Sequence, residues 1–324
     1  MDTNKVPIAA DAGAWAERIR SGDVRSLSRA ITAIENRDPA ARDLLARLFP
    51  ATGAAFLIGC TGAPGTGKST LVDHLALHYR RANQPVGVIA VDPTSPFTGG
   101  AILGDRIRMQ RHAEDSGTFI RSMATRGRLG GLSAATSDAA LLLDAAGKRI
   151  VLIETVGVGQ DEVDVVRLAD CTLVLLVPGF GDDVQSMKAG LMEVADIFVI
   201  NKSDHDGADR LEQQISAMLD LAPDQSAWRP PIVRTVASEG RGVEELAAAI
   251  ARFREHAAKS STRDARRIEH WKRRLLVMLE SELLDRVLAG PNAAAHLDAL
   301  AREVAERRKD PYAAVVEIAV RAQW

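Results

Sequence analysis

Seven short apolar runs separated by helical segments constrain the fold of this chain more than any other feature. They begin near Ala55 and read AAFLIGC, PVGVIAVD, TFIRS, RIVLIETVG, CTLVLLVPG, DIFVINKSD and PPIVRTVAS. A run that is apolar almost throughout is typical of a strand buried on both faces. Such strands, alternating with amphipathic helices, predict an α/β fold in which helices cover both faces of a mainly parallel sheet.

Helical patterns flank this region on both sides. Residues 12–49 carry apolar positions at helical spacing, and Asp23 and Asp38 are suited to cap two of these helices. After Ala248 the pattern is helical again, and one apolar stripe suits a helix that packs on another helix. The stripe consists of Leu275, Leu279, Leu283 and Val287. A last pair of helices is expected after Pro291 and Pro311.

The composition argues against several classes of function. With 41 basic and 43 acidic residues the formal net charge is -2, so no overall field favours nucleic acid or a membrane surface. The two cysteines, Cys60 and Cys171, lie within apolar runs and are expected to be buried thiols in a reducing compartment. No signal peptide is evident, and no run reaches the ~18 apolar residues of a membrane span. We therefore expect a soluble, cytoplasmic protein without nucleic-acid or membrane partners.

A glycine-rich segment follows the first apolar run and precedes a helical one. It reads GAPGTGKS and matches G-x-x-x-x-G-K-[ST], the P-loop that cradles nucleotide phosphates. Lys68 is expected to reach the β- and γ-phosphates, and Ser69 to offer its hydroxyl to Mg²⁺. A glycine-rich turn with a surface lysine is the weaker alternative, because a strand and a helix enclose the loop. The predicted phosphate-binding residues are Gly62, Ala63, Pro64, Gly65, Thr66, Gly67, Lys68, Ser69 and Thr70.

A P-loop alone does not separate kinases, ATPases and GTPases, so the residues that read the base must decide. IFVINKSD ends an apolar run with Asn201, Lys202 and Asp204, which resemble the Asn-Lys-x-Asp signature of GTPases. A carboxylate at Asp204 can accept two hydrogen bonds from guanine, whereas adenine offers no such pair. We expect Lys202 to cover one face of the base, Asn201 to tie this loop to the P-loop, and the amide of Ala237 to contact the guanine O6. GTP and GDP are the predicted ligands.

A further acidic site is expected beside the phosphates. In IETVGVG, Glu154 is placed to hold the Mg²⁺ shell directly or through water, and the amide of Gly157 to sense the γ-phosphate. A strand-end carboxylate beside a glycine-rich turn is the alternative. Asp92 and Asp105 are candidates for the metal or for the attacking water. No residue is clearly suited to orient that water, so slow intrinsic turnover is expected. The predicted catalytic residues are Lys68, Asp92, Asp105, Glu154 and Gly157, and the predicted metal ligands are Ser69, Asp92, Asp105 and Glu154.

Several longer blocks narrow the resemblance from GTPases in general to one family. The blocks are GAPGTGKST, VDPTSPFTGGAILGDRIRM, FIRSMATRGRLGGL, IETVGVGQDE, VPGFGDDVQSMKAGLMEVAD and NKSD. They resemble the MeaB/ArgK family, which includes the human methylmalonic aciduria type A protein. The resemblance covers nearly the whole chain, from IRSGDVRSLSRAITAIENR in the leader to DPYAA near the C-terminus.

This resemblance implies a P-loop GTPase that acts as a chaperone. Such a protein gates the loading of adenosylcobalamin into methylmalonyl-CoA mutase or a related acyl-CoA mutase, and protects that enzyme from inactivation. It also implies a homodimer, for which the apolar stripe of the long helix is a candidate arm; packing within its own domain is the alternative. The expected division is a helical extension at 1–50, a P-loop GTPase domain at 51–256 and a helical dimerisation region at 257–324.

The segment GFGDDVQSMK, residues 179–188, matches the extra switch with which this family couples nucleotide state to the mutase. On the residues alone, an ordinary loop leading into a helix is the simpler account. Phe180 and Ser186 differ from the small or aliphatic residues expected at their positions. The candidate coupling residues are Asp182, Gln185 and Lys188.

Two other functions stay open on the sequence. A metal-insertion GTPase of the hydrogenase or urease maturation type has a related nucleotide domain but needs a His/Cys cluster, which scattered histidines and two strand cysteines do not supply. A nucleotide-dependent protein kinase would need an acceptor pocket and a catalytic base, and neither stands out. Metal content distinguishes the first alternative, and product analysis the second.

Overall fold

The chain forms two compact units, Met1–Arg263 and Asp264–Trp324. The computed structural model describes residues 12–92, 115–124, 131–155, 168–179, 194–221, 228–260, 262–288, 290 and 292–321. Among these residues, no helix is long and apolar enough to cross a bilayer.

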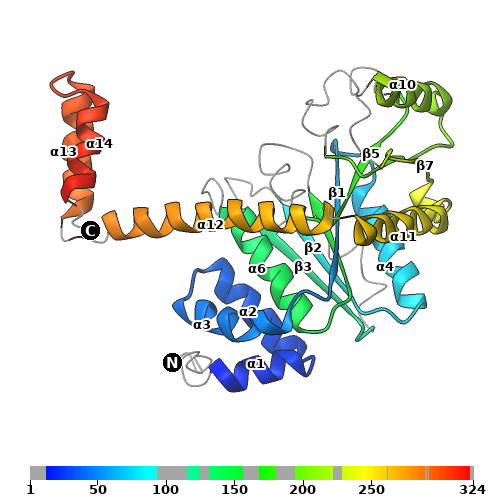
Figure 1. Cartoon of the computed structure of the whole chain (residues 1–324), viewed down its shortest axis with the longest axis horizontal. Helices are drawn as coiled ribbons and strands as arrows, with labels where there is room; N and C mark the ends of the chain where they lie inside the picture. Colours follow the sequence, from blue (N-terminus) through cyan, green and yellow to red (C-terminus); the bar gives the residue numbers. More distant parts are fainter. Residues whose placement is uncertain are drawn as a thin grey trace, which may run out of the picture. The chain divides into compact units, whose positions relative to one another are not determined.

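A seven-stranded parallel sheet forms the centre of the first unit (Figure 1). The strand order is β3-β2-β4-β1-β5-β6-β7, and every neighbouring pair is parallel. The strands are β1 (Phe56–Gly62), β2 (Val86–Asp92), β3 (Thr118–Ala124), β4 (Ile150–Thr155), β5 (Cys171–Leu176), β6 (Ile197–Ile200) and β7 (Ile232–Arg234). All seven predicted strands and the predicted parallel sheet are confirmed.

The two faces of the sheet build separate cores, because successive side chains of a strand point to opposite faces. In β4, Leu152 belongs to one core and Ile153 to the other, and both are fully buried. This double burial explains why the strands read as continuous apolar runs. Cys60 and Cys171 lie in the same core as Leu152 and are buried free thiols, as predicted.

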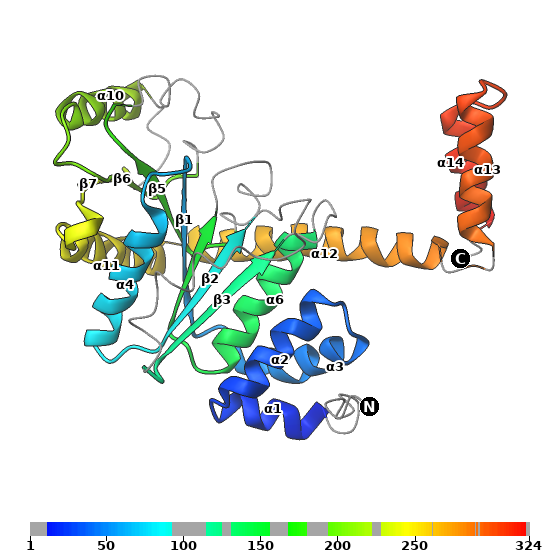
Figure 2. The ribbon, with the colours of Figure 1, turned by 180° about the vertical axis from the view of Figure 1, so that it is seen from behind.

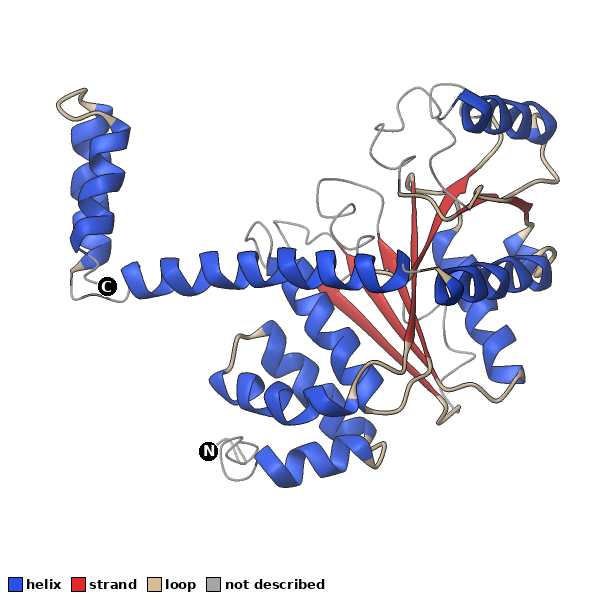
Figure 3. Cartoon of the chain, in the orientation of Figure 1, coloured by secondary structure: helices blue, strands red, loops and turns tan. Residues whose placement is uncertain are grey.

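Helices cover both faces of the sheet (Figure 3). On one face, α4 (Lys68–Arg81) and α11 (Val243–Lys259) pack over the core that holds both cysteines. On the other, α6 (Gly131–Ala145) packs over β2, β3 and β4, and α10 (Ala208–Leu221) over β6. The predicted helical layers are therefore confirmed. The described part of this unit also contains two short 3-10 helices: η1 (Phe49–Ala51) and η3 (Ala237–Glu239).

Three helices form the predicted N-terminal leader: α1 (Ala12–Arg20), α2 (Val24–Glu35) and α3 (Pro39–Leu48). They pack against α6, as Figure 2 shows from behind. Their buried side chains belong to the same core as those of α6. Asp23 accepts a hydrogen bond from the amide of Arg25 at 2.8 Å, and Asp38 one from Ala40 at 2.9 Å, so both predicted caps are confirmed. An ion pair between Glu35 and Arg121 joins α2 to β3, at the edge of the sheet.

The second unit is helical. It contains most of α12 (Thr262–Leu288), with α13 (Ala293–Ala305) and α14 (Pro311–Arg321). Leu300 and Ala314 are buried where α13 and α14 pack on one another. In the apolar stripe of α12, Leu275 and Leu279 are 60% and 52% exposed, whereas Leu283 and Val287 are half-buried. No described residue therefore covers the first half of the stripe.

Candidate functional site

The predicted site residues meet at the carboxyl ends of three strands. Gly62 ends β1, Glu154 is the last residue but one of β4, and Asn201 directly follows β6. The sheet order puts β1 between β4 and β5, with β6 beyond β5. In a parallel sheet the loops that follow the strands all lie beyond the same end of the sheet, and ligands bind there.

Lys68 is held across the loop that precedes it. Its ammonium donates to the carbonyl oxygens of Gly62 at 2.7 Å and Ala63 at 2.9 Å, and the residue is only 5% exposed. Thr66 closes the same turn, because its hydroxyl donates to Ala63 O at 2.9 Å. The segment therefore forms a compact loop with a positive charge at its centre, the arrangement a phosphate group requires.

Two glycines of this loop occupy places that no other residue can fill. Gly67 stands at the N-terminus of α4 with φ 91°, and a Cβ there would overlap the side-chain nitrogen of Asn201. A Cβ at Gly62 would overlap the carbonyl oxygen of Leu175 in the neighbouring strand. The motif's glycines thus serve close packing as well as backbone freedom.

Asn201 joins the loop after β6 to the P-loop, as predicted. Its amide nitrogen donates to Thr66 O at 2.7 Å. Its side-chain oxygen accepts from the hydroxyl of Thr235 and from the amide of Ala237, both at 3.0 Å. The residue is 2% exposed, so these hydrogen bonds are shielded from water. One side chain therefore fixes three segments of the site.

The next residues of this loop reach toward the same place. Lys202 has φ 54°, in the left-handed region, and its ammonium donates to Gly65 O at 3.0 Å. Its stem thus spans the gap between the loop after β6 and the P-loop. The side chain of Asp204 is 41% exposed, with His205 4.0 Å away. The Asp204 carboxylate is therefore accessible to a ligand beside this lysine.

Ser69 and Glu154 form the acidic corner of the site. The hydroxyl of Ser69 donates to Oε1 of Glu154 at 2.5 Å, across a sequence separation of 85 residues. Glu154 is 5% exposed. Hydroxyl and carboxylate oxygens are the donors that Mg²⁺ prefers, so this pair fits the predicted ion. Burial raises the pKa of the neighbouring Cys60 thiol, and the Glu154 charge raises it further, so this thiol is unreactive.

Comparison with known proteins identifies the family. Residues 27–292 match the family described as "Methylmalonyl Co-A mutase-associated GTPase MeaB". The chain belongs to the MeaB family. The resemblance inferred from the motif blocks is therefore confirmed, and the match runs from helix α2 to the start of the last two helices.

Individual relatives support membership of the MeaB family. A putative GTPase of Pyrococcus abyssi is 48% identical over 305 residues, 92% of this chain and 93% of that protein. The mitochondrial methylmalonic aciduria type A homolog of Caenorhabditis elegans is 32% identical over 285 residues, 82% of this chain and 71% of that protein. The crystal structure of an LAO/AO transport system kinase has a TM-score of 0.71 and 28% identity, covering 97% of this chain and 98% of that chain.

Several predicted site residues of this MeaB-family chain lie outside the described part of the structure. They are Asp105, Gly157, Asp182, Gln185 and Lys188. The backbone of Asp92 ends β2, beside β4, but its side chain is not among those described. Their predicted roles therefore stay predictions.

The structure also adds a contact to one predicted residue and brings one further residue into the site. The amide of Ala237 donates to the side-chain oxygen of Asn201, and its contact with the guanine O6 stays a prediction. Thr235 was not predicted as a site residue, yet its hydroxyl binds Asn201 and its carbonyl oxygen accepts from the amide of Ser203 at 3.1 Å. Its position two residues before Ala237, at the end of an apolar run, was the available signal.

Proposed function

We propose that this chain is a Mg²⁺-dependent GTPase that gates the loading of adenosylcobalamin into methylmalonyl-CoA mutase or a related acyl-CoA mutase, and protects that enzyme. The observation that carries the nucleotide part is the Asn201 network, which joins the P-loop to the loop with the guanine-reading residues. Family membership carries the mutase part. Related proteins are named GTPases, which agrees with the proposed reaction.

Asp204 selects guanine in this proposal. Its exposed carboxylate accepts hydrogen bonds from the N1 and N2 groups of the base, and the stem of Lys202 covers one face of the ring. A site built around such a pair of hydrogen bonds discriminates strongly between guanine and adenine, because adenine would leave the polar groups of the site unpaired.

A change of base preference tests this selection. Asp204→Asn replaces an acceptor by an amide that donates to the C2 carbonyl of xanthine. The variant should lose GTP affinity and gain affinity for xanthosine triphosphate, measured by competition against a fluorescent nucleotide. Retained preference for GTP in the folded variant would remove Asp204 from base recognition.

At the phosphate end, the chain's own groups bind and orient the triphosphate. Lys68 exchanges its carbonyl partners for β- and γ-phosphate oxygens, and the P-loop amides add hydrogen bonds. Ser69 and Glu154 are the groups that would hold Mg²⁺, with Asp92 and Asp105 as further candidates. When bound, the ion neutralises charge on the phosphate oxygens. The amide of Gly157 senses the γ-phosphate. When hydrolysis removes this phosphate, the change is transmitted to the segment around Gly157.

Coupling to the mutase is assigned to residues 179–188. In this proposal Asp182, Gln185 and Lys188 change their contacts with the mutase when the nucleotide changes. Intrinsic turnover is slow and the mutase accelerates it. The chain acts as a homodimer, in which the exposed leucines of α12 are covered by a second copy.

One alternative retains support from a comparison. The similar crystal structure is named a transport system kinase, so transfer of phosphate to an acceptor deserves a direct test. Product analysis distinguishes the two reactions, since a GTPase releases inorganic phosphate and a kinase labels an acceptor. For the metal-insertion alternative, the described residues contain no group of three or more His, Cys, Asp or Glu side chains suited to hold a metal ion.

A further inference from the structure

A pocket separate from the P-loop lies at the opposite end of the strands, near the amino-terminal ends of β2, β3 and β4. Its volume is about 340 Å³, within the range of small-ligand sites. Arg80 from the end of α4 and Lys148 from the turn after α6 line it. Val24 and Leu27 of the leader helix α2 line it as well. All of these residues lie within the first compact unit.

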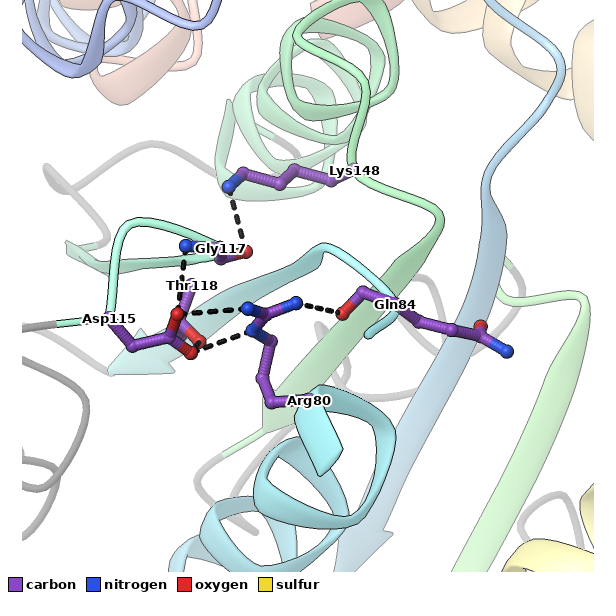
Figure 4. Close-up of polar contacts among 6 residues, drawn as sticks. All are labelled: Arg80, Gln84, Asp115, Gly117, Thr118 and Lys148. Carbon is purple, nitrogen blue, oxygen red and sulfur yellow. Dashed lines mark hydrogen bonds and ion pairs between the residues drawn. The ribbon is translucent and has the colours of Figure 1, made fainter. Parts of the chain in front are cut away.

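The charge of Arg80 is already paired (Figure 4). Its guanidinium donates to both carboxylate oxygens of Asp115, at 2.7 Å and 3.0 Å, and to Gln84 O at 3.0 Å. Asp115 also accepts from the Gly117 amide at 3.0 Å and the Thr118 hydroxyl at 2.9 Å. The carboxylate therefore has its hydrogen-bonding capacity filled and its charge matched by one cation.

Lys148 is a second cation beside this pair. It is only 8% exposed, and within the described chain its ammonium donates one hydrogen bond, to Gly117 O at 2.9 Å, and forms no ion pair. Burial lowers the pKa of this ammonium, the Arg80 charge lowers it further, and Asp115 offsets part of the shift. An ammonium has three donors, so two N–H groups of Lys148 are available to a ligand in the pocket.

Arg80, Asp115 and Lys148 together carry a net charge of about one positive unit at neutral pH. Burial of an ammonium without a carboxylate is unfavourable unless an anion accompanies it. Part of the remaining lining is apolar: Leu27 and Phe119 contribute hydrocarbon surface, and Val24 presents a branched side chain, 51% exposed, at the rim, while Ser116 is polar. The pocket thus combines one unmatched positive charge with an apolar surface.

We propose that this pocket binds a short aliphatic carboxylate, whose oxygens accept hydrogen bonds from Lys148 and whose hydrocarbon chain lies against Val24 and Leu27. A monoanion matches the single unmatched charge, whereas a phosphate dianion would bring excess negative charge and would leave the apolar wall without a partner. The ligand bridges the leader helices and the sheet. This site is separate from the nucleotide site and does not depend on the proposed GTPase reaction.

Butanoate is the probe, titrated into the full-length, GDP-bound protein by isothermal titration calorimetry, with saturation-transfer NMR as a second readout. Butanamide has the same shape without the charge, and inorganic phosphate is an anion without the hydrocarbon. We expect saturable butanoate binding that is at least about tenfold tighter than binding of either control. Equal binding of butanamide, tighter binding of phosphate, or no saturable binding of butanoate would overturn the proposal.

A matched pair of variants locates the site. Val24 is partly exposed at the start of α2, where an acidic residue is compatible with the helix, so Val24→Glu and Val24→Gln should both fold. Val24→Glu places a negative charge at the pocket rim and should bind butanoate about tenfold more weakly than Val24→Gln. Lys148→Met should reduce affinity similarly. Equal affinities in the two Val24 variants would show that butanoate binds elsewhere.

Discussion

The amide nitrogen of Asn201 donates a 2.7 Å hydrogen bond to the carbonyl oxygen of Thr66, across 135 residues of sequence. The same side chain accepts from Thr235 and from Ala237. These contacts between protein groups hold the P-loop, the loop after β6 and the loop after β7 together. Such preorganisation reduces the ordering cost of binding.

Asn201→Ala removes all three hydrogen bonds. The carbonyl oxygen of Thr66 loses its donor, and the Thr235 hydroxyl and the Ala237 amide lose their acceptor. Each buried polar group that is left unpaired costs about 1–3 kcal/mol. We expect the free energy of unfolding to fall by about 2–4 kcal/mol and GDP affinity to fall with it, measured by denaturation and fluorescent GDP titration. Gln213→Ala, which removes an exposed amide from α10, is the control. Unchanged GDP affinity in Asn201→Ala would contradict the role of this network.

Two glycines of the P-loop differ in what surrounds them. Gly65 and Gly67 both have positive φ, 81° and 91°, so alanine strains the backbone at either position. A Cβ at Gly67 overlaps the side chain of Asn201, whereas no described residue has an atom within 4 Å of a Cβ at Gly65. Gly67→Ala should therefore lower the melting temperature and GDP affinity well beyond Gly65→Ala. Equal effects in both would show that backbone strain alone matters here.

Glu154→Gln keeps the shape of the side chain and removes its charge. Ser69 can still donate to the amide oxygen, so the local packing should persist. Loss of a negative oxygen beside the ion should raise the Mg²⁺ concentration needed for half-maximal phosphate release by about 10- to 100-fold. Ser69→Ala should act in the same direction. A wild-type Mg²⁺ dependence in folded Glu154→Gln would remove this carboxylate from the metal site.

Asp115 makes the stability of the fold depend on pH. Hydrogen bonds from Arg80, and then from the Gly117 amide and the Thr118 hydroxyl, hold the pKa of Asp115 well below its usual value. Because the folded pKa is lower than the unfolded value of about 3.9, this carboxylate stabilises the fold above that pH. Its contribution is lost as the pH falls further toward the folded pKa.

Asp115→Asn should therefore lower the melting temperature at neutral pH and lower it less at acidic pH. Thermal unfolding of the wild type and the variant at pH ~6 and ~3 measures this difference. Asp206→Asn, at an exposed position in the loop after β6, is the control and should show no such convergence. A difference between wild type and Asp115→Asn that is the same at both pH values would contradict the account.

Local patterns predicted much of this molecule. The central strands were visible because they are buried on both faces, and the edge strands because they too are short apolar runs between helices. The caps at Asp23 and Asp38 were visible because a capping side chain acts on amides two or three residues away. The link from Asn201 to the P-loop followed from a motif with a known geometry.

Contacts between distant segments were not predictable in the same way. Arg80 and Asp115 are 35 residues apart and share no motif, so only the fold brings them together. The packing of the leader against α6 depends on which face of each helix meets which neighbour, and periodicity gives the face but not the neighbour. The hydrogen bond from the amide of Ala237 to the side chain of Asn201 also joins segments that are 36 residues apart, and no local pattern predicts it.

The most direct test of the account is phosphate release by the purified protein, alone and with candidate adenosylcobalamin-dependent acyl-CoA mutases, with GTP or ATP as substrate and Lys68→Ala as the inactive control. We predict slow, GTP-specific release that one of these mutases accelerates and that Lys68→Ala abolishes. A rate indifferent to every mutase, or a preference for ATP, would contradict it.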